Sequence, residues 1–229
     1  KYYEKTKNTE EYYKKYLTFN QKDYLCWNDL GVVYREQKDY KEALKAFEKA
    51  KSGLPENSEI WVNIGLTYQE MDDFTQALLS FENAIKFDAK SFKAWFYRGC
   101  LIYDKLKDEE KGLKCFEKVV SLEPTFYKAW HRIGKHYQDK GEEHKSVHCY
   151  KKATELAPSI PDVWIGLAKV YHVLNKFTPA ISSYKTYLEL EPKDKDSWKA
   201  LGDCYYETLE YELLIEAYKN ALDEIENSY

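Results

Sequence analysis

The residues best suited to chemistry gather at one place in this 229-residue sequence, at His144, His148 and Cys149. Two histidines four residues apart share one face of a helix, which is a spacing found in metal sites. Cys149 falls off that face and no further ligand stands out, so we interpret the histidines as solvated surface residues. No glycine-rich phosphate loop, Ser/His/Asp order or close pair of carboxylates is apparent. We therefore expect no enzyme activity, no metal and no cofactor.

The six tryptophans show how the chain is built. They recur at intervals of 34 or 35 residues and are Trp27, Trp61, Trp95, Trp130, Trp164 and Trp198. A unit of about 34 residues is too short to bury an apolar face of its own. The copies must therefore stack on one another, so the spacing predicts a solenoid of repeated units.

Two apolar stripes keep a fixed distance from each tryptophan. If the tryptophan is position 4 of a repeat, position 8 is Gly31, Gly65, Gly99, Gly134, Ala168 or Gly202. Positions 4, 7, 8 and 11 lie on one face of an α-helix, which we name helix A. Positions 20, 24 and 27, as in Ala43, Phe47 and Ala50, predict a second helix, helix B. Position 32 is proline in four repeats, where it ends helix B.

This order of Trp, Gly and Tyr, then Ala, Phe and Ala, then Pro resembles the tetratricopeptide repeat family. The resemblance implies an all-α fold in which antiparallel helix pairs stack into a right-handed α-α superhelix. We place six repeats at 24–57, 58–91, 92–126, 127–160, 161–194 and 195–228, after a partial repeat at 1–23, in a single array over residues 1–229. The third repeat has one extra residue between Gly99 and Gly112, which we expect in the turn between its two helices.

Both ends of the array look unfinished. Residues 9–20 match helix B of an incomplete repeat, and no polar closing helix follows Ala221, although terminal repeats need a polar outer face. We therefore expect a fragment of a larger protein. We also expect Tyr218 and Leu214 to be exposed at the last helix, or covered by self-association through the C-terminal end.

Composition narrows the class of partner. The net charge is −4 with lysines and acids interleaved, which argues against a nucleic-acid partner. No apolar run approaches the length of a membrane span, and the charged N-terminus is unlike a signal peptide, so we expect no membrane association. Five cysteines without metal-site spacing suit free thiols in a reducing compartment, which predicts a cytoplasmic protein.

In the resembled family, the second face of helix A lines a concave groove. Positions 2, 5, 9 and 12 centre roughly 120° around helix A from the core stripe. Along this face and beside it, apolar residues in the early repeats give way to basic ones. The candidate partner-binding residues are Val32, Val62, Asn63, Leu66, Phe96, Tyr97, Tyr103, Lys128, His131, Arg132, Lys135, Lys169 and His172. Position 13 adds a line of acids, Glu36, Glu70, Asp104, Asp139 and Glu207.

These features predict a non-enzymatic scaffold that binds a partner protein or peptide segment in its groove. The apolar groove residues have a second interpretation as ordinary packing between neighbouring helices, and the acids as solvated or lysine-paired. Two other functions stay open at this point. The array could regulate or recruit substrates for a larger enzyme whose catalytic domain lies outside this sequence, or it could serve as a structural spacer in an assembly.

Overall fold

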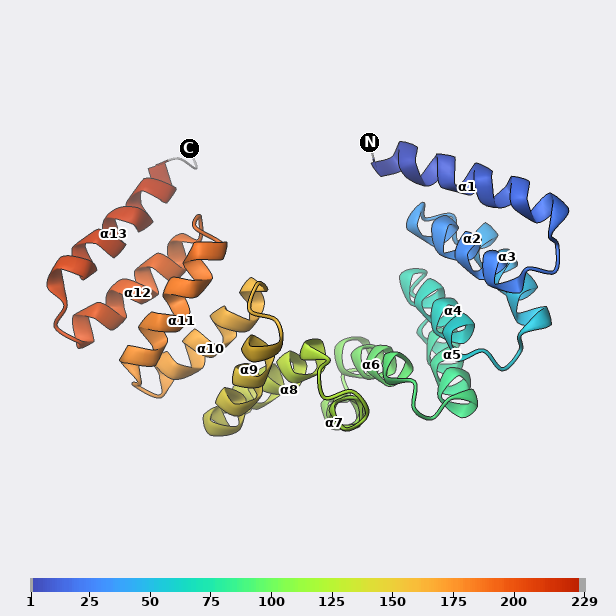
Figure 1. The fold of residues 1–229 in the computed structure, drawn as a ribbon. Helices are drawn as coiled ribbons and strands as arrows, with labels where there is room; N and C mark the ends of the chain where they lie inside the picture. Colours follow the sequence, from blue (N-terminus) through green and yellow to red (C-terminus); the bar gives the residue numbers. More distant parts are fainter. Residues whose placement is uncertain (1, 227–229) are drawn as a thin grey trace. The chain divides into compact units, whose positions relative to one another are not determined.

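The computed structural model describes residues 2–226, and side chains at 8–222, as an all-α protein (Figure 1). Thirteen α-helices and one π-helical turn occur in that range. They are α1 (Tyr2–Phe19), α2 (Tyr24–Glu36), α3 (Tyr40–Gly53), α4 (Ser58–Glu70), α5 (Phe74–Phe87), α6 (Phe92–Cys100), η1 (Leu101–Lys105), α7 (Glu109–Leu122), α8 (Tyr127–Asp139), α9 (Glu143–Leu156), α10 (Pro161–Val173), α11 (Phe177–Leu190), α12 (Lys195–Glu207) and α13 (Tyr211–Glu226). The predicted all-α fold of sequential antiparallel helix pairs is confirmed.

The helices belong to two compact units, unit 1 (Lys1–Leu122) and unit 2 (Glu123–Tyr229). In unit 1 the A helices α2, α4 and α6 pair with the B helices α3, α5 and α7, and α1 packs on α2. In unit 2 the A helices α8, α10 and α12 pair with α9, α11 and α13. Each B helix also contacts the next A helix of its own unit. That the two units form a single array stays a prediction.

Each helix pair turns at a residue with positive φ. These residues are Lys38, Asp72, Lys107, Gly141, Asn175 and Leu209. A left-handed residue after a helix lets the next amide reach back to a free carbonyl of the last turn. The amide of Asp73 thus donates to the carbonyl of Tyr68 at 2.9 Å, and Asp39 bonds Tyr34 in the same way. The Asp73 side chain then accepts the amide of Gln76 and begins helix α5.

The two helices of a pair touch where a glycine of helix A meets an aromatic ring of helix B. A Cβ atom added at Gly65 would lie 2.6 Å from Cε1 of Phe81, and one at Gly31 would lie 2.5 Å from Phe47. Both phenylalanines are fully buried. Glycine fits position 8 of these pairs because the ring occupies the space that a side chain would fill, whereas α10 carries the buried Ala168 at this position.

Each tryptophan ties its helix to the turn before it. The indole Nε1–H donates to the backbone carbonyl of the residue six positions earlier in every repeat, for example from Trp61 to Pro55 at 2.8 Å. The others bond Gln21, Ala89, Pro124, Pro158 and Pro192. The tryptophans are only half-buried, so they join one repeat to the next at the edge of the core.

The extra residue of the third repeat lies within the first helix of the pair, so our expectation of a longer turn was wrong. Helix α6 continues as the π-helical turn η1, in which the amide of Leu106 donates to the carbonyl of Leu101, five residues back. A π-helical turn holds one more residue than an α-helical turn. The turn that follows keeps its positive-φ residue, Lys107. The insertion is therefore absorbed before the chain reverses.

The C-terminal helix pair exposes other apolar residues than the sequence suggested. Tyr218 packs its ring against Gly202 and donates its hydroxyl to Asp203 at 2.6 Å. Leu214 packs partly buried on the core of unit 2. Large apolar side chains exposed in this region are instead Tyr206, Leu209, Tyr211, Leu213, Ile215 and Leu222. Tyr211, Leu213, Ile215 and Leu222 belong to α13, whereas Tyr206 lies in the last turn of α12 and Leu209 in the turn between the two helices. None of the helices described here combines the length and apolar character that a membrane crossing needs.

Exposed apolar residues on α13 generate a test of self-association. Ile215 is 54 % exposed and Leu222 is 57 % exposed, whereas the corresponding Ile181 and Leu188 of α11 pack into the core of unit 2. We expect sedimentation equilibrium to show concentration-dependent association that Ile215→Lys weakens, because burying a charge at this interface is unfavourable. Thr178→Lys, an exposed change on α11 with the same added charge, should leave association unaltered. A strict monomer at every concentration would contradict this expectation.

Candidate protein-binding surface

The predicted partner-binding residues lie on the A helices and on η1, beside the stripe of positions 4, 7, 8 and 11. We name positions 2, 5, 6, 9 and 12 of each A helix the A-face. Its predicted members belong to α2, α4, α6 and η1 in unit 1 and to α8 and α10 in unit 2.

Two of the predicted apolar contact residues in unit 1 are core residues. Val62 is 3 % exposed and belongs to an interior cluster with Phe81. Phe96 is 9 % exposed, and its ring centroid lies 5.8 Å from that of Phe116. Neighbouring A helices also contact each other, so α4 and α6 cover part of each other's A-face. Val62 and Phe96 are therefore packed within unit 1 and do not present a surface to a partner.

The remaining apolar members of this surface are partly open. Val32, Leu66, Tyr97 and Tyr103 are all half-buried. The Tyr97 ring stacks on Phe81 with centroids 6.2 Å apart, and the Tyr103 ring tilts against Phe116 at 6.0 Å. Because buried phenylalanine rings pack against them, these two tyrosines offer rigid contact area.

Polar pairs link neighbouring A helices of unit 1. Asn63, one of the predicted contact residues, donates from Nδ2 to Oδ1 of Asn28 at 2.9 Å. Two ion pairs also connect adjacent repeats, from Arg35 to Glu70 at 3.6 Å and from Lys93 to Glu59 at 3.5 Å. The members of these pairs stand 34 or 35 residues apart, at the spacing of the repeat, and a helical projection of one repeat does not bring them together. Part of the A-face of unit 1 therefore joins one repeat to the next.

The A-face of unit 2 is basic and more open. Lys128 and Lys135 of α8 and Lys169 of α10 are exposed, and none of the three has an ion-pair partner among the described residues. Arg132 of α8 is half-buried on the same face. The acid Asp162 stands on the same face at the start of α10, and its carboxylate influences the pKa of His131. Cations outnumber acids here, so this surface attracts negatively charged groups.

The two histidines of this surface pack against aromatic rings. The ring of His131 tilts against Tyr150 with centroids 5.6 Å apart, and His172 meets Tyr184 edge-on at 6.1 Å. Burial lowers the pKa of His131 below its ordinary 6.5. The Asp162 carboxylate opposes this shift, while Arg132 and Lys135 add to it. His131 thus adds little positive charge to the surface at neutral pH.

The histidine pair considered for metal binding is placed differently. His144 and His148 are exposed on α9, and the His148 ring meets Trp130 edge-on with centroids 6.1 Å apart. Cys149 is buried, 4 % exposed. Within the part of the chain that the structure describes, no group of three or more His, Cys, Asp or Glu residues could hold a metal ion.

Comparison with known families settles what kind of repeat this is. Tetratricopeptide repeat models match residues 24–52, 58–91, 92–126, 127–160 and 161–194, which is more than half of the chain. The chain belongs to the tetratricopeptide repeat family. Tetratricopeptide repeats are protein-interaction domains. The sixth helix pair, α12 and α13, lies beyond the matched residues but has the same glycine and tyrosine contact, between Gly202 and Tyr218.

Solved structures share the fold at low sequence identity. The chain is 20 % identical to MamA, with a TM-score of 0.66 over 75 % of this chain and 93 % of MamA. It is 17 % identical to YrrB, described as a tetratricopeptide repeat protein with an unusual peptide-binding site, with a TM-score of 0.68 over 78 % and 92 % of the two chains. A chain of the Cut9–Hcn1 hetero-tetramer of the APC/C is 15 % identical, with a TM-score of 0.68 over 95 % of this chain and 43 % of that one. None of the curated proteins matches the sequence.

The environment of His131 generates a pH prediction. Because its folded-state pKa lies below the unfolded value, protonation favours unfolding, and stability falls as the pH drops from about 6.5 toward the folded pKa. We expect an NMR titration to find the His131 pKa below 6.5 in the native protein. Lys135→Gln should raise it, because a like charge is removed, and Asp162→Asn should lower it further. Shifts in the opposite directions would show that these groups do not surround His131 as described.

Proposed function

We propose that this chain is a non-enzymatic scaffold that binds a segment of another protein through the A-face. The observation that carries the proposal is the set of exposed, unpaired lysines on unit 2, Lys128, Lys135 and Lys169. The sequence contains 39 Asp and Glu, yet none of the described acids forms an ion pair with these three lysines. Three cations on two adjacent helices without such partners suit an acidic segment.

The A-face of unit 1 supports a partner with apolar side chains. Val32, Leu66, Tyr97 and Tyr103 offer half-buried apolar contact area, whereas Val62 and Phe96 hold the helices together from within. Rigid tyrosines are frequent in binding surfaces because they bury much area at a small entropic cost. We therefore infer that apolar contacts determine how long a partner stays on unit 1, and that charge determines how fast one reaches unit 2.

The relatives support a protein partner. YrrB is described as having a peptide-binding site, and Cut9 forms a hetero-tetramer with Hcn1. Both are similar to this chain in fold alone, so the chemistry of the partner follows from the chain's own side chains.

The proposal predicts a preference that peptide display can measure. Random dodecapeptides selected for binding to the native chain should be enriched in Asp and Glu, and should bind more weakly as salt rises. The triple variant Lys128→Glu, Lys135→Glu and Lys169→Glu should lower the affinity of the selected peptides by about tenfold or more, because three ion pairs are lost.

A matched triple variant controls for net charge. Lys145→Glu, Lys176→Glu and Lys193→Glu change the charge by the same amount at exposed positions of unit 2 outside the A-face. Affinity for the selected peptides should change little in this variant. Selected peptides without acidic enrichment, or an equal loss in both variants, would overturn the proposed site.

A further inference from the structure

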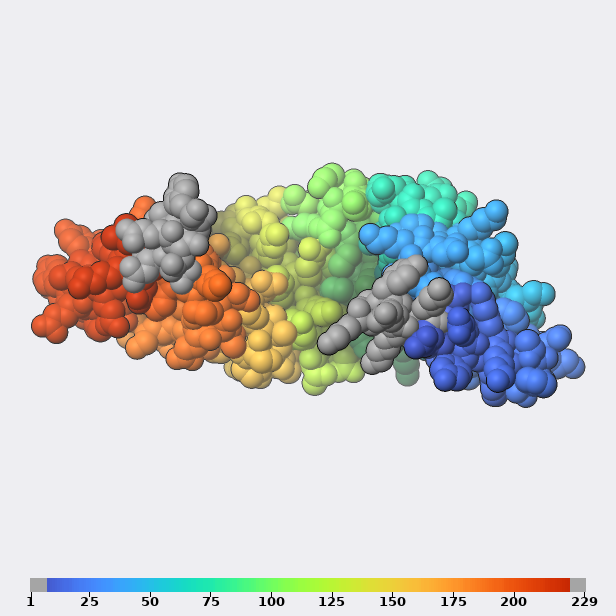
Figure 2. Space-filling model, turned by 90° about the horizontal axis from the view of Figure 1, so that it is seen from above, coloured from blue at the N-terminus to red at the C-terminus, as the bar shows by residue number. Residues whose placement is uncertain are grey.

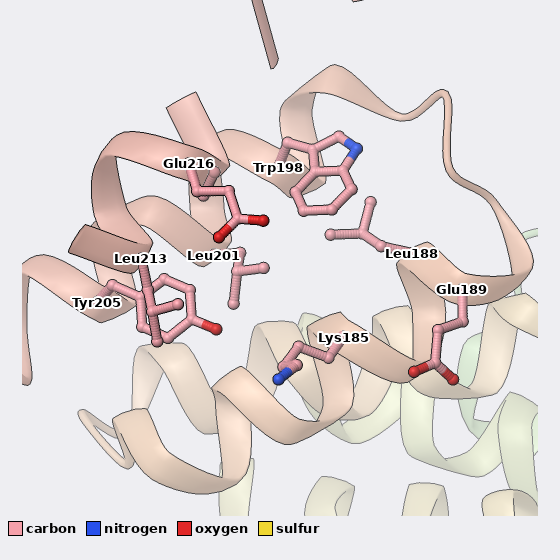
Figure 3. A pocket seen from close by; sticks show the side chains of 9 residues that line it. Lys185, Leu188, Glu189, Trp198, Leu201, Tyr205, Leu213 and Glu216 are labelled. Carbon is pink, nitrogen blue, oxygen red and sulfur yellow. The ribbon is translucent and has the colours of Figure 1, made fainter. Parts of the chain in front are cut away.

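Unit 2 contains a pocket beside the A helix α12, on the side of this helix that carries positions 4, 7 and 11 and not the A-face. The pocket has a volume of about 230 Å³ and lies between α11, α12 and α13 (Figure 3). Leu188, Leu201 and Ala217 contribute its apolar part. Trp198 and Tyr205, at positions 4 and 11 of α12, contribute aromatic rings. Position 4 and position 11 face the B helices, so this pocket is separate from the proposed binding surface.

At other junctions between a B helix and the next A helix, the chain places a cation over the equivalent ring. The ring belongs to position 4 or position 11 in each case. The distances from cation to ring centroid are 5.4 Å for Lys14 over Tyr34, 4.9 Å for Lys51 over Trp61, 5.9 Å for Arg98 over Trp95 and 6.0 Å for Lys151 over Tyr171. Such contacts are favourable because the face of an aromatic ring is electronegative.

Arg98 shows how a guanidinium fits this space. It stands at position 7 of α6, where Leu201 stands in α12. Its Nη2 lies 3.4 Å from Oε1 of Glu82 on the preceding B helix, and its Nη1 donates to Sγ of Cys115 at 3.3 Å. One arginine thus meets a tryptophan ring, a carboxylate and the apolar interior together.

The junction between α11 and α12 lacks this cation. No lysine or arginine among the described residues lies over the ring of Trp198 or Tyr205. Lys185 nevertheless occupies the same repeat position as Lys14 and Lys151. Lys185 instead lines the open pocket. At this junction the rings of Trp198 and Tyr205 therefore border an open pocket, and no described cation of the chain lies over them.

Carboxylates at the pocket favour a positively charged occupant. Glu189 and Glu216 both line it, and Figure 3 shows the Glu216 carboxylate turned toward the space beside Trp198. Neither has an ion-pair partner among the described residues of the chain. With Lys185 as the one cation of the lining, acids outnumber bases at this pocket.

We propose that this pocket binds an arginine side chain of a partner protein. The guanidinium lies against Trp198 and pairs with Glu216, while the aliphatic stem contacts Leu188 and Leu201. Arginine fits better than lysine because a planar guanidinium stacks on a ring and donates in parallel to a carboxylate. Within the chain, the Arg98 guanidinium lies near both a tryptophan ring and a carboxylate. The occupant is thus opposite in charge to the acidic segment proposed for the A-face.

The probe for this proposal is the blocked pentapeptide acetyl-Ala-Ala-Arg-Ala-Ala-amide. Titration into the ¹⁵N-labelled protein should shift the indole N–H signal of Trp198, assigned from its loss in Trp198→Phe, along a saturable curve. The same peptide with citrulline, which keeps the shape of arginine without its charge, should shift it much less. Equal shifts by the two peptides, or no saturable shift by the arginine peptide, would overturn the proposal.

Substitutions then locate the binding groups. Glu216→Gln should weaken binding of the arginine peptide about two- to fivefold, as expected for one partly exposed ion pair. Glu212→Gln, on the same helix but outside the pocket, should leave it unchanged. Lys185→Ala should strengthen binding, because a like charge is removed. Equal effects of the two glutamate substitutions would place the peptide elsewhere and contradict the assignment.

A filled pocket provides a second check. The double variant Leu201→Arg with Lys185→Glu copies the arrangement of Arg98 and Glu82 and should occupy the site from within. We expect this variant to lose the saturable shift of Trp198 while its circular dichroism spectrum stays helical. Undiminished binding of the arginine peptide by the folded variant would show that the peptide does not enter this pocket.

Discussion

The close contact between a glycine of helix A and an aromatic ring of helix B determines how five of the six pairs are arranged, and the pair of α10 and α11 has Ala168 in place of the glycine. At Gly31, Gly65 and Gly202 a Cβ atom would come within 3.0 Å of the facing ring. The ring is buried against the backbone itself, so the helices approach more closely than side chains on both would allow. Once this contact fixes which stripe of helix A is covered, the A-face and the pocket side of each helix are fixed as well. Figure 2 shows one face of the surface, with α2 and α3 in blue and α12 and α13 in orange and red.

The third repeat shows that this contact is maintained when the chain changes in length. A Cβ atom at Gly99 would lie 2.9 Å from the Phe116 ring, as in repeats without the extra residue. The π-helical turn η1 takes up that residue beyond Gly99, where Tyr103 packs over Gly112. Insertions that form π-helical turns keep the residues on both sides in helical register. The extra residue therefore alters the end of one A helix and leaves its pairing intact.

The sequence predicted the fold well and the surface only in part. The tryptophan spacing and the stripe at positions 4, 7, 8 and 11 predicted helices, pairing and family, because these depend on contacts within one repeat. The burial of Val62 and the hydrogen bond between Asn28 and Asn63 depend on contacts between A helices of neighbouring repeats. A helical projection of one repeat does not contain those contacts. Lys185 and Lys151 are likewise identical in type and position, yet only Lys151 lies over a ring.

The free energy of unfolding of Gly65→Ala, measured by urea denaturation, tests the contact between glycine and ring most directly. In the interior of a helix with open space around it, replacing glycine by alanine stabilises a protein by about 0.5–1 kcal/mol, because alanine loses less backbone entropy. Here the new methyl group would lie 2.6 Å from the buried ring of Phe81, so the contact requires a loss of stability. We therefore predict that Gly65→Ala lowers the free energy of unfolding, and a gain in stability would contradict the claim that this contact sets the spacing of the helix pair.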